Sequence, residues 1–309
     1  MNSNKPNIVS AAPCVTCQSN LMTVVRHQGK FIIAKCQNCQ LMQVTPMPSA
    51  EELNAHYQHP AYFEGEETPG YKSYADVKKA LQPFFARRLH EIKKALPTGK
   101  TLLDFGCAAG YFLEMARNEN WQIHGVELSA EMSAQASELL GTKIYHSIQE
   151  QPKSNFDAVT LWEVIEHVPN PVEQLMQLKE KLRTGGILML STPNNGHWQA
   201  IREPDNWTVY RPPSHLIYFT AQTLTNTLKQ AGFEKINVRG VAPLPPLPKW
   251  LKSMSEPLRQ RLITGQSTHW QIDLLIWRLI RLFAWAWQKI AHSKDDIFTT
   301  LEATAFKPS

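Results

Sequence analysis

The spacing of apolar and polar residues alternates between two periods through the middle of the chain, from residue 75 to residue 243. Short apolar runs predict strands at residues 101–105, 122–127, 143–146, 156–162, 186–191 and 234–241. Apolar residues at helical spacing predict helices at residues 75–96, 111–120, 130–140, 171–183 and 221–231. Strands that alternate with helices in this way are typical of βαβ units around a parallel sheet. The pattern therefore predicts an α/β fold with helices on both faces of the sheet.

Segments of different character flank this core. Residues 1–45 contain four cysteines, and residues 46–74 are rich in proline and glycine, which predicts a linker with one short helix at residues 49–56. Beyond the core at residues 75–243, an insertion at residues 244–294 combines a proline-rich start with helical spacing. Residues 295–309 then contain the last strand, at residues 297–306. The chain thus divides into an N-terminal module, a linker, a core, a helical insertion and a final strand of the core.

Composition and charge limit the classes of function. Of the 309 residues, 43% are hydrophobic, which fits a folded globular chain, and the net charge is +5. Residues 249–294 alone hold eight Lys or Arg and two acidic residues, so the rest of the chain is near neutral. This distribution disfavours a nucleic-acid partner and indicates a local basic surface. Since the sequence has neither an apolar stretch of 18 residues nor a signal peptide, we expect a cytoplasmic protein.

Four of the five cysteines form two pairs, Cys14-x-x-Cys17 and Cys36-x-x-Cys39, with eighteen residues between the pairs. This spacing is typical of a structural zinc ribbon, in which two turns aim four thiolates at one ion. Residues 22–26 and 30–35 predict the two short strands of the ribbon around a turn at residues 27–29. Disulfides and a redox dithiol are the alternatives. The absence of a signal peptide disfavours the first, and the second leaves one pair unexplained.

A glycine-containing loop follows the first predicted core strand and opens the next helix. It reads Asp104-Phe-Gly-Cys-Ala-Ala-Gly110, and its glycines allow a sharp turn close to a ligand at a helix N-terminus. The loop lacks the Lys-Ser/Thr of a P-loop and differs from the dinucleotide pattern G-x-G-x-x-G. Glu127 ends the next strand, where a carboxylate can hold both ribose hydroxyls of an adenosine ligand. Within the loop, Cys107 fits a small-residue position better than a nucleophile.

Five segments together resemble class I S-adenosylmethionine-dependent methyltransferases, in particular the ubiquinone/menaquinone-type branch. They are LLDFGCAAGYFL at residues 102–113, GVELS at 125–129, FDAVTLWEVIEHVPN at 156–170, GGILMLSTPN at 185–194 and HLIYFT at 215–220. The resemblance covers residues 75–243 and the last strand, and it implies a Rossmann-like sheet of seven strands. The N-terminal module, followed by PMPSAEEL at residues 46–53 and by Tyr57, Tyr62 and Phe63, resembles ribbon-headed methyltransferases of bacterial secondary and envelope metabolism.

The resemblance also implies which residues contact S-adenosylmethionine. Asp104, Gly106 and Gly110 would shape the methionine pocket, Glu127 would hold the ribose, and residues 161–163 would flank the sulfonium. The full implied set is Asp104, Gly106, Cys107, Ala108, Gly110, Tyr111, Phe112, Glu127, Leu128, Leu161, Trp162 and Glu163. One departure concerns the adenine amine, which an acidic residue after the third strand often binds in this family. Here that segment reads His146-Ser-Ile148, so the acidic residue expected for this contact is missing.

Three candidate catalytic residues are Glu163, His167 and His215. Glu163, Glu166 and His167 share the spacing i, i+3, i+4, so a helical turn would place them on one face. Methyl transfer from a sulfonium mainly requires positioning, and a base is needed only if the acceptor loses a proton. His167 or His215 could accept that proton. Glu163, Glu166 and His167 could instead hold a divalent cation, as the quinone-type enzymes suggest, or they could simply pack and solvate the loop.

The insertion at residues 244–294 holds five of the nine tryptophans. Between residues 272 and 290, one helical face is apolar and the other carries Arg278, Arg281, Gln288 and Lys289. Such a helix is typical of a peripheral membrane anchor, which residues 249–294 would provide, but it could also cover the core or a second subunit. We therefore expect methyl transfer to an O, N or C acceptor on a small molecule or an envelope-glycan or lipid-linked substrate. An RNA methyltransferase and an inactive cofactor-binding module are the alternatives.

Overall fold

The computed structural model describes residues 8–9, 13–58, 74–241, 247, 249–264, 269–292 and 294–308. The chain divides into two compact units, the first formed by Met1–Pro193, Thr208–Arg239 and Leu301–Ser309, the second by Asn194–Trp207 and Gly240–Thr300. Most of the expected linker, including Tyr62 and Phe63, lies outside the described residues, as does the proline-rich stretch at 243–248 apart from Leu247.

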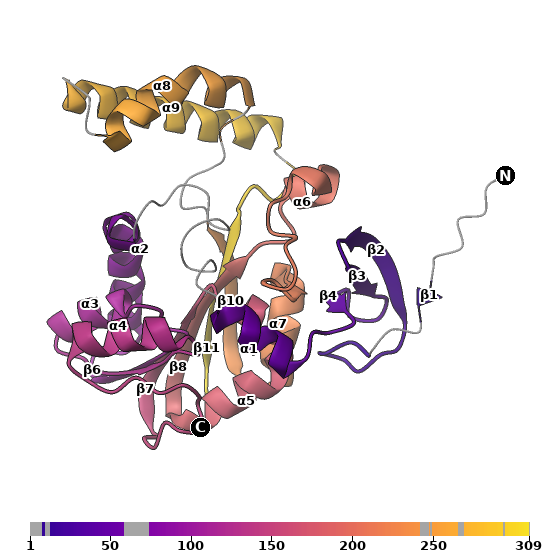
Figure 1. The fold of residues 1–309 in the computed structure, drawn as a ribbon, viewed down its shortest axis with the longest axis vertical. Coiled ribbons are helices and arrows are strands. Elements are labelled where there is room, and N and C mark those ends of the chain that lie inside the picture. The colour runs from indigo at the N-terminus through magenta and orange to yellow at the C-terminus, as the bar shows by residue number, and fades with distance from the viewer. Residues whose placement is uncertain are drawn as a thin grey trace. The chain divides into compact units, whose positions relative to one another are not determined.

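The larger sheet of the first unit has six named strands in the order β10-β11-β8-β7-β5-β6 (Figure 1). Their bounds are β5 Thr101–Phe105, β6 Gln122–Val126, β7 Phe156–Trp162, β8 Leu182–Pro193, β10 Glu234–Val241 and β11 Thr300–Phe306. The pairs β5–β6, β5–β7 and β7–β8 are parallel. The carboxyl ends of these four strands consequently meet at one edge of the sheet, which confirms the expected α/β class.

The strand expected at residues 143–146 is reduced to a single parallel bridge between Val126 and Tyr145. The chain bends at residues 146–147 and turns at residues 148–150, so it leaves β6 directly after Tyr145. The two neighbouring amides, which point away from β6, bind side chains instead. The amide of Ile144 donates to the Ser137 hydroxyl, and the amide of His146 donates to the Glu150 carboxylate. The described sheet therefore has six strands and one bridge in place of the expected seven strands.

Helices cover both faces of this sheet because successive strand residues point to opposite sides. On one face, Leu102, Ala158 and Ile187 pack with residues of α2 (Tyr74–Ala95), α3 (Tyr111–Asn118) and α4 (Ala130–Leu140). On the other, Leu103, Val159 and Leu188 pack with α5 (Pro171–Lys181) and α7 (Ala221–Gln230). The two layers of helices fix the strand ends that carry the candidate site.

A smaller antiparallel sheet has the order β1-β2-β3-β4-β9. Its strands are β1 Ile8–Val9, β2 Met22–Gln28, β3 Phe31–Cys36, β4 Met42–Thr45 and β9 Ile217–Tyr218. The last of these comes from the expected core at residues 75–243, and β4 pairs with it through Met42–Tyr218 and Gln43–Ile217. Helix α1 (Ala50–Gln58) follows β4 and begins with a capping box, in which Ser49 and Glu52 bind each other's backbone amides.

The second unit contains three α-helices among its described residues: α6 Trp198–Arg202, α8 Lys249–Thr264 and α9 Trp270–Ala291. Helices α8 and α9 run side by side as a hairpin (Figure 1). In the described part of the chain, every helix is too short or too polar to cross a membrane.

Candidate functional site

The loop between β5 and α3 turns sharply at the carboxyl edge of the sheet. Gly106 and Gly110 have φ values of 76° and 80°, and Ala108 lies in the same left-handed region at 45°. The amides of Gly106 and Cys107 both donate to the carbonyl of Val126, at 2.8 and 3.1 Å. A Cβ atom on Gly106 would lie 2.5 Å from a methyl group of Val164. The loop is thus fixed to β6 and to the segment after β7, and glycine at position 106 is required by both conformation and space.

Glu127 lies directly beside this loop, at the carboxyl end of β6. One carboxylate oxygen accepts from the amide of Ala108 and the other from the amide of Ser129, each at 2.9 Å. Burial raises the pKa of Glu127, and these amides oppose the shift by stabilising the ionised form. The structure therefore brings together the loop and the acid that the sequence analysis paired.

Asp104, in β5, is almost fully buried, and its side chain reaches toward β7. Its carboxylate accepts from the hydroxyl of Thr160 at 2.6 Å, and burial raises its pKa to about 7. Ionising Asp104 is therefore less favourable than ionising an exposed aspartate. A cationic group placed near it would stabilise the charged form.

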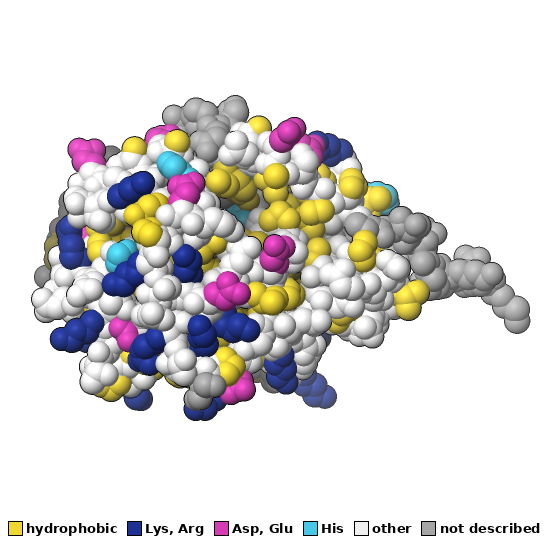
Figure 2. Space-filling model, turned by 90° about the horizontal axis from the view of Figure 1, so that it is seen from below, with side chains coloured by type: hydrophobic (Ala, Val, Ile, Leu, Met, Phe, Trp, Pro, Cys, Tyr) yellow, Lys and Arg dark blue, Asp and Glu magenta, His cyan; other side chains and the backbone are white. Residues whose placement is uncertain are grey.

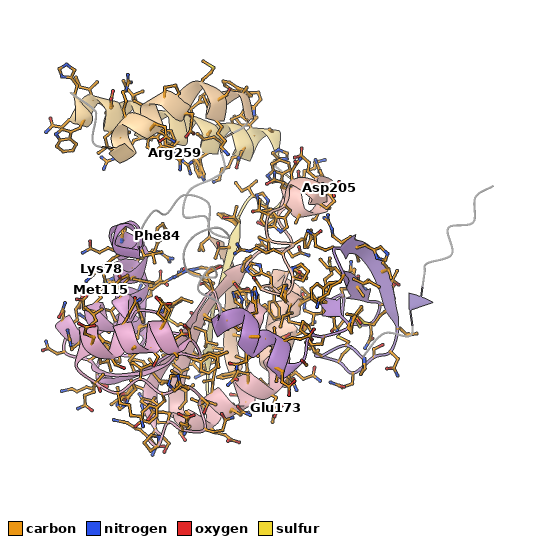
Figure 3. All side chains as sticks on the ribbon, viewed as in Figure 1. Lys78, Phe84, Met115, Glu173, Asp205 and Arg259 are labelled. Atoms are coloured by element: carbon orange, nitrogen blue, oxygen red, sulfur yellow. The ribbon has the colours of Figure 1, made fainter. Side chains whose placement is uncertain are left out.

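The other expected cofactor residues divide into buried and accessible ones. Cys107 is buried under the loop, where burial raises its pKa well above the ordinary thiol value, so it stays a neutral thiol. Phe112 and Leu161 lie in the core, whereas Leu128 is exposed. Tyr111, the first residue of α3, lies beneath the ammonium of Lys78 from α2, which also pairs with Glu114 at 2.5 Å. Figure 3 labels Lys78 of α2 and, beside it, Met115 of α3.

Trp162 stands at the end of β7 between an aromatic and a cationic neighbour. Its ring meets Phe112 edge-to-face at 5.2 Å, and the guanidinium of Arg88 lies 4.3 Å from the ring centre. Arg88 is itself held by the buried carboxylate of Glu302 at 3.0 Å. The sequence analysis missed this pair, although a signal was present. Arg88 follows Phe85 by three residues and precedes Ile92 by four, so it is an arginine within the apolar stripe of a helix.

Glu163 has a backbone conformation that is rare outside glycine, with φ at 57°. Its amide donates to the carbonyl of Ser191 at 3.1 Å, and its side chain is exposed. The expected helical turn begins only after this residue, as a 3₁₀ turn at Ile165–His167. Glu163 therefore lies before this turn, although its carboxylate is close enough for its charge to add to the raised pKa of Glu166.

The residue that joins Glu166 and His167 is instead His215. Each of these three side chains has one atom that could bind a metal ion, and the three atoms lie within 4.8 Å of one another. The rings of His167 and His215 are perpendicular, with centres 4.9 Å apart. One oxygen of the buried Glu166 accepts from Thr192 at 2.9 Å, and the other, which has no hydrogen-bond partner among the described residues, lies 3.8 Å from Nε2 of His167. Burial raises the pKa of Glu166 well above its usual value.

Residues of α1 complete the surroundings of this cluster. The hydroxyl of Tyr57 lies 3.2 Å from Nδ1 of His167 and donates to the carbonyl of Ser214 at 3.3 Å. His56 contacts the Ser214 hydroxyl at 2.9 Å. Burial lowers the pKa of His167 to about 4 and that of His215 well below its ordinary value, so both imidazoles are neutral at physiological pH. Nε2 of His215 also accepts from the guanidinium of Arg211 at 3.2 Å.

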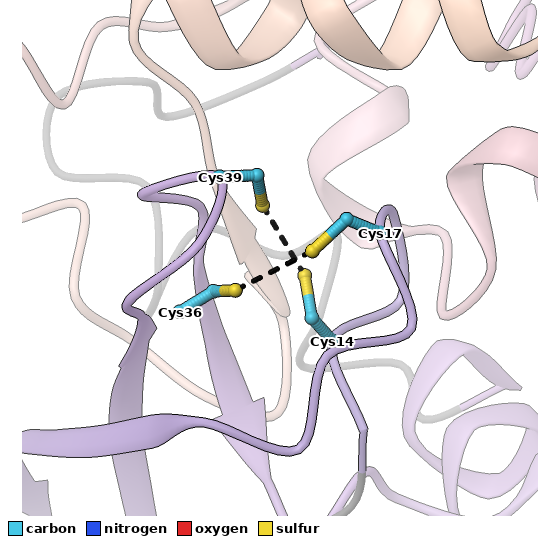
Figure 4. A group of neighbouring side chains, drawn as sticks. All are labelled: Cys14, Cys17, Cys36 and Cys39. Carbon is cyan, nitrogen blue, oxygen red and sulfur yellow. Dashed lines mark hydrogen bonds between the residues drawn. The ribbon is translucent and has the colours of Figure 1, made fainter.

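The four cysteines of the small sheet converge on one point (Figure 4). The Sγ atoms of Cys14 and Cys39 are 3.4 Å apart, those of Cys17 and Cys36 are 3.5 Å apart, and all four lie within 4.8 Å of one another. A disulfide would need about 2.05 Å. Four thiolates around a tetrahedral zinc ion at about 2.3 Å would be separated by about 3.8 Å. The cysteines are therefore free thiols positioned for a metal.

Two matching turns produce this arrangement. The amide of Gln18 donates to the carbonyl of Cys14, and the amide of Gln40 donates to the carbonyl of Cys36, both at 2.9 Å. Each turn ends in the left-handed conformation, with φ at 58° for Gln18 and 66° for Gln40. Burial raises the pKa of Cys14 to about 11, so without a cation this thiol stays neutral at physiological pH.

Charged side chains on the face shown in Figure 2 are mixed in sign. Lys and Arg side chains there alternate with acidic and hydrophobic ones. This face lacks, among the residues that are described, the continuous basic surface that a phosphate backbone would require.

Comparisons with known proteins agree with this geometry. A family model described as "Methyltransferase domain" matches residues 77–238. The ubiquinone biosynthesis O-methyltransferase of Xanthomonas axonopodis pv. citri is 31% identical over 127 residues, which are 38% of this chain and 53% of that protein. The protein of the same name from Idiomarina loihiensis is 28% identical over 159 residues, 46% of this chain and 65% of the relative. The chain therefore spans between half and two thirds of the length of these relatives.

Two solved structures show the same fold. A SAM-dependent methyltransferase from Archaeoglobus fulgidus has a TM-score of 0.53 at 17% identity and covers 81% of this chain and 100% of its own. Phosphoethanolamine N-methyltransferase 2 of Haemonchus contortus has a TM-score of 0.52 at 19% identity and covers 86% of this chain and 62% of its own.

Proposed function

The chain belongs to the methyltransferase domain family and is an S-adenosylmethionine-dependent methyltransferase; from this premise we propose that it methylates a hydroxyl oxygen of a small-molecule acceptor. The observation that carries the proposal is the partly buried, neutral His167 at the carboxyl edge of the sheet, close to the accessible Glu163 with its positive φ. Its relatives named as O-methyltransferases support an oxygen acceptor.

We propose that the donor lies along the loop at residues 104–110. Glu127 would hold the ribose hydroxyls, Leu128 would cover the adenine, and Asp104 would act near the cationic amino group of the methionine end. The buried Asp104 supports this assignment, because a nearby cation would favour its ionised form. Residues 161–163 would then flank the sulfonium, which supplies an already activated methyl group.

The chain's own contribution to the chemistry would be to position the acceptor and to receive its proton. As the new O–C bond forms, the hydroxyl proton becomes strongly acidic, so even a weak base can take it. We assign this role to Nε2 of His167, because Nδ1 is in contact with the Tyr57 hydroxyl. Glu163 would hydrogen-bond the acceptor hydroxyl, and His215 would hold the ring of His167 in place through their perpendicular contact.

A divalent cation is the competing role for this cluster. The partnerless oxygen of the buried Glu166 and the neutral His167 suit such an ion, which would lower the pKa of an acceptor hydroxyl. The guanidinium of Arg211, 3.2 Å from Nε2 of His215, opposes a positive ion at the third position. We therefore favour proton acceptance by His167 over ligation.

The cysteine cluster would serve the structure and not the reaction. We propose that Cys14, Cys17, Cys36 and Cys39 hold one Zn²⁺ ion with all four positions filled, because the sulfur separations suit a closed tetrahedral site. An ion in that shell would have no open position for substrate, and its binding would add to the stability of the folded sheet.

The test is a transfer assay with labelled S-adenosylmethionine and three acceptor classes: a catechol, a primary amine and RNA. We expect label on the catechol alone. His167→Asn should lower kcat by roughly 100-fold while S-adenosylhomocysteine binds with unchanged affinity. His90→Asn, which changes an exposed histidine on α2, is the matched control. Label on the amine or the RNA alone, or a His167→Asn enzyme with unchanged kcat, would overturn the proposal.

A further inference from the structure

Helix α9 exposes most of its large apolar side chains. Between 38% and 76% of each exposed side chain is open to solvent. The exposed set comprises Trp270, Ile272, Leu275, Ile276, Leu279, Leu282, Phe283, Trp285, Trp287 and Ile290. These positions extend over the whole helix, which is about 33 Å long at 1.5 Å per residue. An apolar surface of this extent on a described helix marks a contact with another apolar phase or molecule.

Some polar side chains of α9 are withdrawn from solvent. Asp273 forms an ion pair with Arg261 of α8 at 3.6 Å. Arg281 is partly buried, and burial lowers its pKa. The buried residues described in the hairpin are both apolar and polar: Leu251, Ser255, Leu258, Ala284 and Gln288. Most of the large apolar side chains of α9 are thus left outside the contact between the two helices.

Charge and tryptophan placement indicate what this apolar surface contacts. Residues 249–294 carry eight basic and two acidic residues. The ammonium of Lys289 lies 4.3 Å from the ring centre of Trp285, and exposed tryptophans occupy both ends of α9, at Trp270 and at Trp287. Tryptophan and lysine together are typical of the boundary between lipid headgroups and acyl chains.

We propose that the α8–α9 hairpin binds the surface of an anionic phospholipid bilayer, with the outer face of α9 lying in the headgroup–acyl boundary. The basic surplus attracts acidic headgroups, whereas it would repel the same face of a second copy of the chain. The hairpin lies on the bilayer and does not cross it, since neither helix is apolar enough to span. This surface goes beyond the methyl-transfer reaction, and its test requires no turnover.

The experiment is flotation of the full chain with two kinds of vesicle. One consists of phosphatidylcholine alone, and in the other about one lipid in three is the acidic phosphatidylglycerol. We expect the protein to float with the acidic vesicles and to be released by high salt. Leu279→Asn with Phe283→Asn should reduce the bound fraction at least about tenfold, as expected for two lost apolar contacts. Ile201→Asn with Met176→Asn, at exposed apolar positions outside the hairpin, is the matched control and should leave flotation unchanged.

Each outcome decides between occupants of the face. Flotation that the hairpin variant loses and the control variant keeps supports the proposal. Absence of flotation with either vesicle overturns it, as does a dimer in light scattering that the hairpin variant dissociates without any vesicle binding. If the double variant fails to fold by circular dichroism, Ile290→Asn in the last turn of α9 replaces it. Because S-adenosylhomocysteine binding and catechol methylation are measured in separate assays, failure here leaves the proposed reaction independently testable.

Discussion

Gly106→Ala isolates the two physical demands on the cofactor loop, which are backbone conformation and space. At a φ of 76°, an alanine is strained by about 1–2 kcal/mol, of which about 0.4–1 kcal/mol is offset by the lower freedom of alanine in the unfolded chain. The new methyl group would also lie 2.5 Å from Val164, an overlap that costs about 1–3 kcal/mol when a packed site must adjust. We expect a total destabilisation of about 2–4 kcal/mol.

Gly141→Ala supplies the matched control. Gly141 has a φ of 60°, and a Cβ there would touch no described atom within 4 Å, so this variant should carry the conformational strain alone, about 1 kcal/mol. A third variant, Gly106→Ala with Val164→Ala, removes the overlapping methyl group. In a double-mutant cycle it should recover about 1–2 kcal/mol relative to the sum of the two single changes.

The assay is urea unfolding followed by circular dichroism, with S-adenosylhomocysteine affinity measured by calorimetry on the same samples. Gly106→Ala should bind the ligand at least about tenfold more weakly, because the loop must shift to relieve the overlap. A tenfold loss of affinity corresponds to about 1.4 kcal/mol of binding free energy. Equal destabilisation by the Gly106 and Gly141 variants would refute the overlap argument. Strict additivity in the cycle would refute it as well.

Three other groups of contacts give measurable expectations. Glu127→Ala should weaken S-adenosylhomocysteine binding by roughly 100-fold in calorimetry, since two charged hydrogen bonds of about 1.5–3 kcal/mol are lost, and unchanged binding would refute the ribose assignment. Cys39→Ser should lose zinc in elemental analysis and lower Tm while Cys107→Ser keeps both, and a metal-free wild-type protein would contradict the ribbon. Burial alone would raise the pKa of Glu302, but a hydrogen bond from Arg87 and the charge of Arg88 hold it at about 2. The ionised Glu302 therefore contributes about 3 kcal/mol to the free energy of unfolding. This contribution is full above about pH 5 and is lost as the pH falls toward 2. The stability difference between wild type and Glu302→Gln in urea unfolding should therefore shrink between pH 6 and pH 3, and a constant difference would contradict the ion-pair argument.

Most of the fold and the cysteine cluster could be predicted from local patterns in the sequence. Strand and helix periods depend on neighbouring residues, so the βαβ order and both helical layers were predictable from spacing alone. The prediction of an edge strand at residues 143–146 was wrong, because the chain bends at residues 146–147 and leaves β6 after one bridge. The apolar spacing of so short a segment does not show where the chain turns away.

The surroundings of His167 were less predictable because they depend on residues far apart in the chain. Tyr57 lies 110 positions before His167, and His215 joins the cluster from the loop that precedes β9 and α7. The assumed helical turn failed at Glu163, whose positive φ was invisible in the sequence. Arg88 and Glu302 are separated by 214 positions, and only the arginine's place within an apolar stripe hinted at a buried partner.

The pairing of β4 with β9 has a consequence for how such enzymes can diversify. Strand β9 begins two residues after His215, and α1, which follows β4, contacts both His167 and Ser214. The cysteine-bearing module and the wall around these histidines are therefore built as one piece from opposite parts of the chain. Recombination that exchanged the first 58 residues for those of another methyltransferase would leave the loop at residues 104–110 intact and would replace His56 and Tyr57, which contact Ser214 and His167. On the proposed role of His167, a change of acceptor would then require paired changes in residues 42–57 and 211–218.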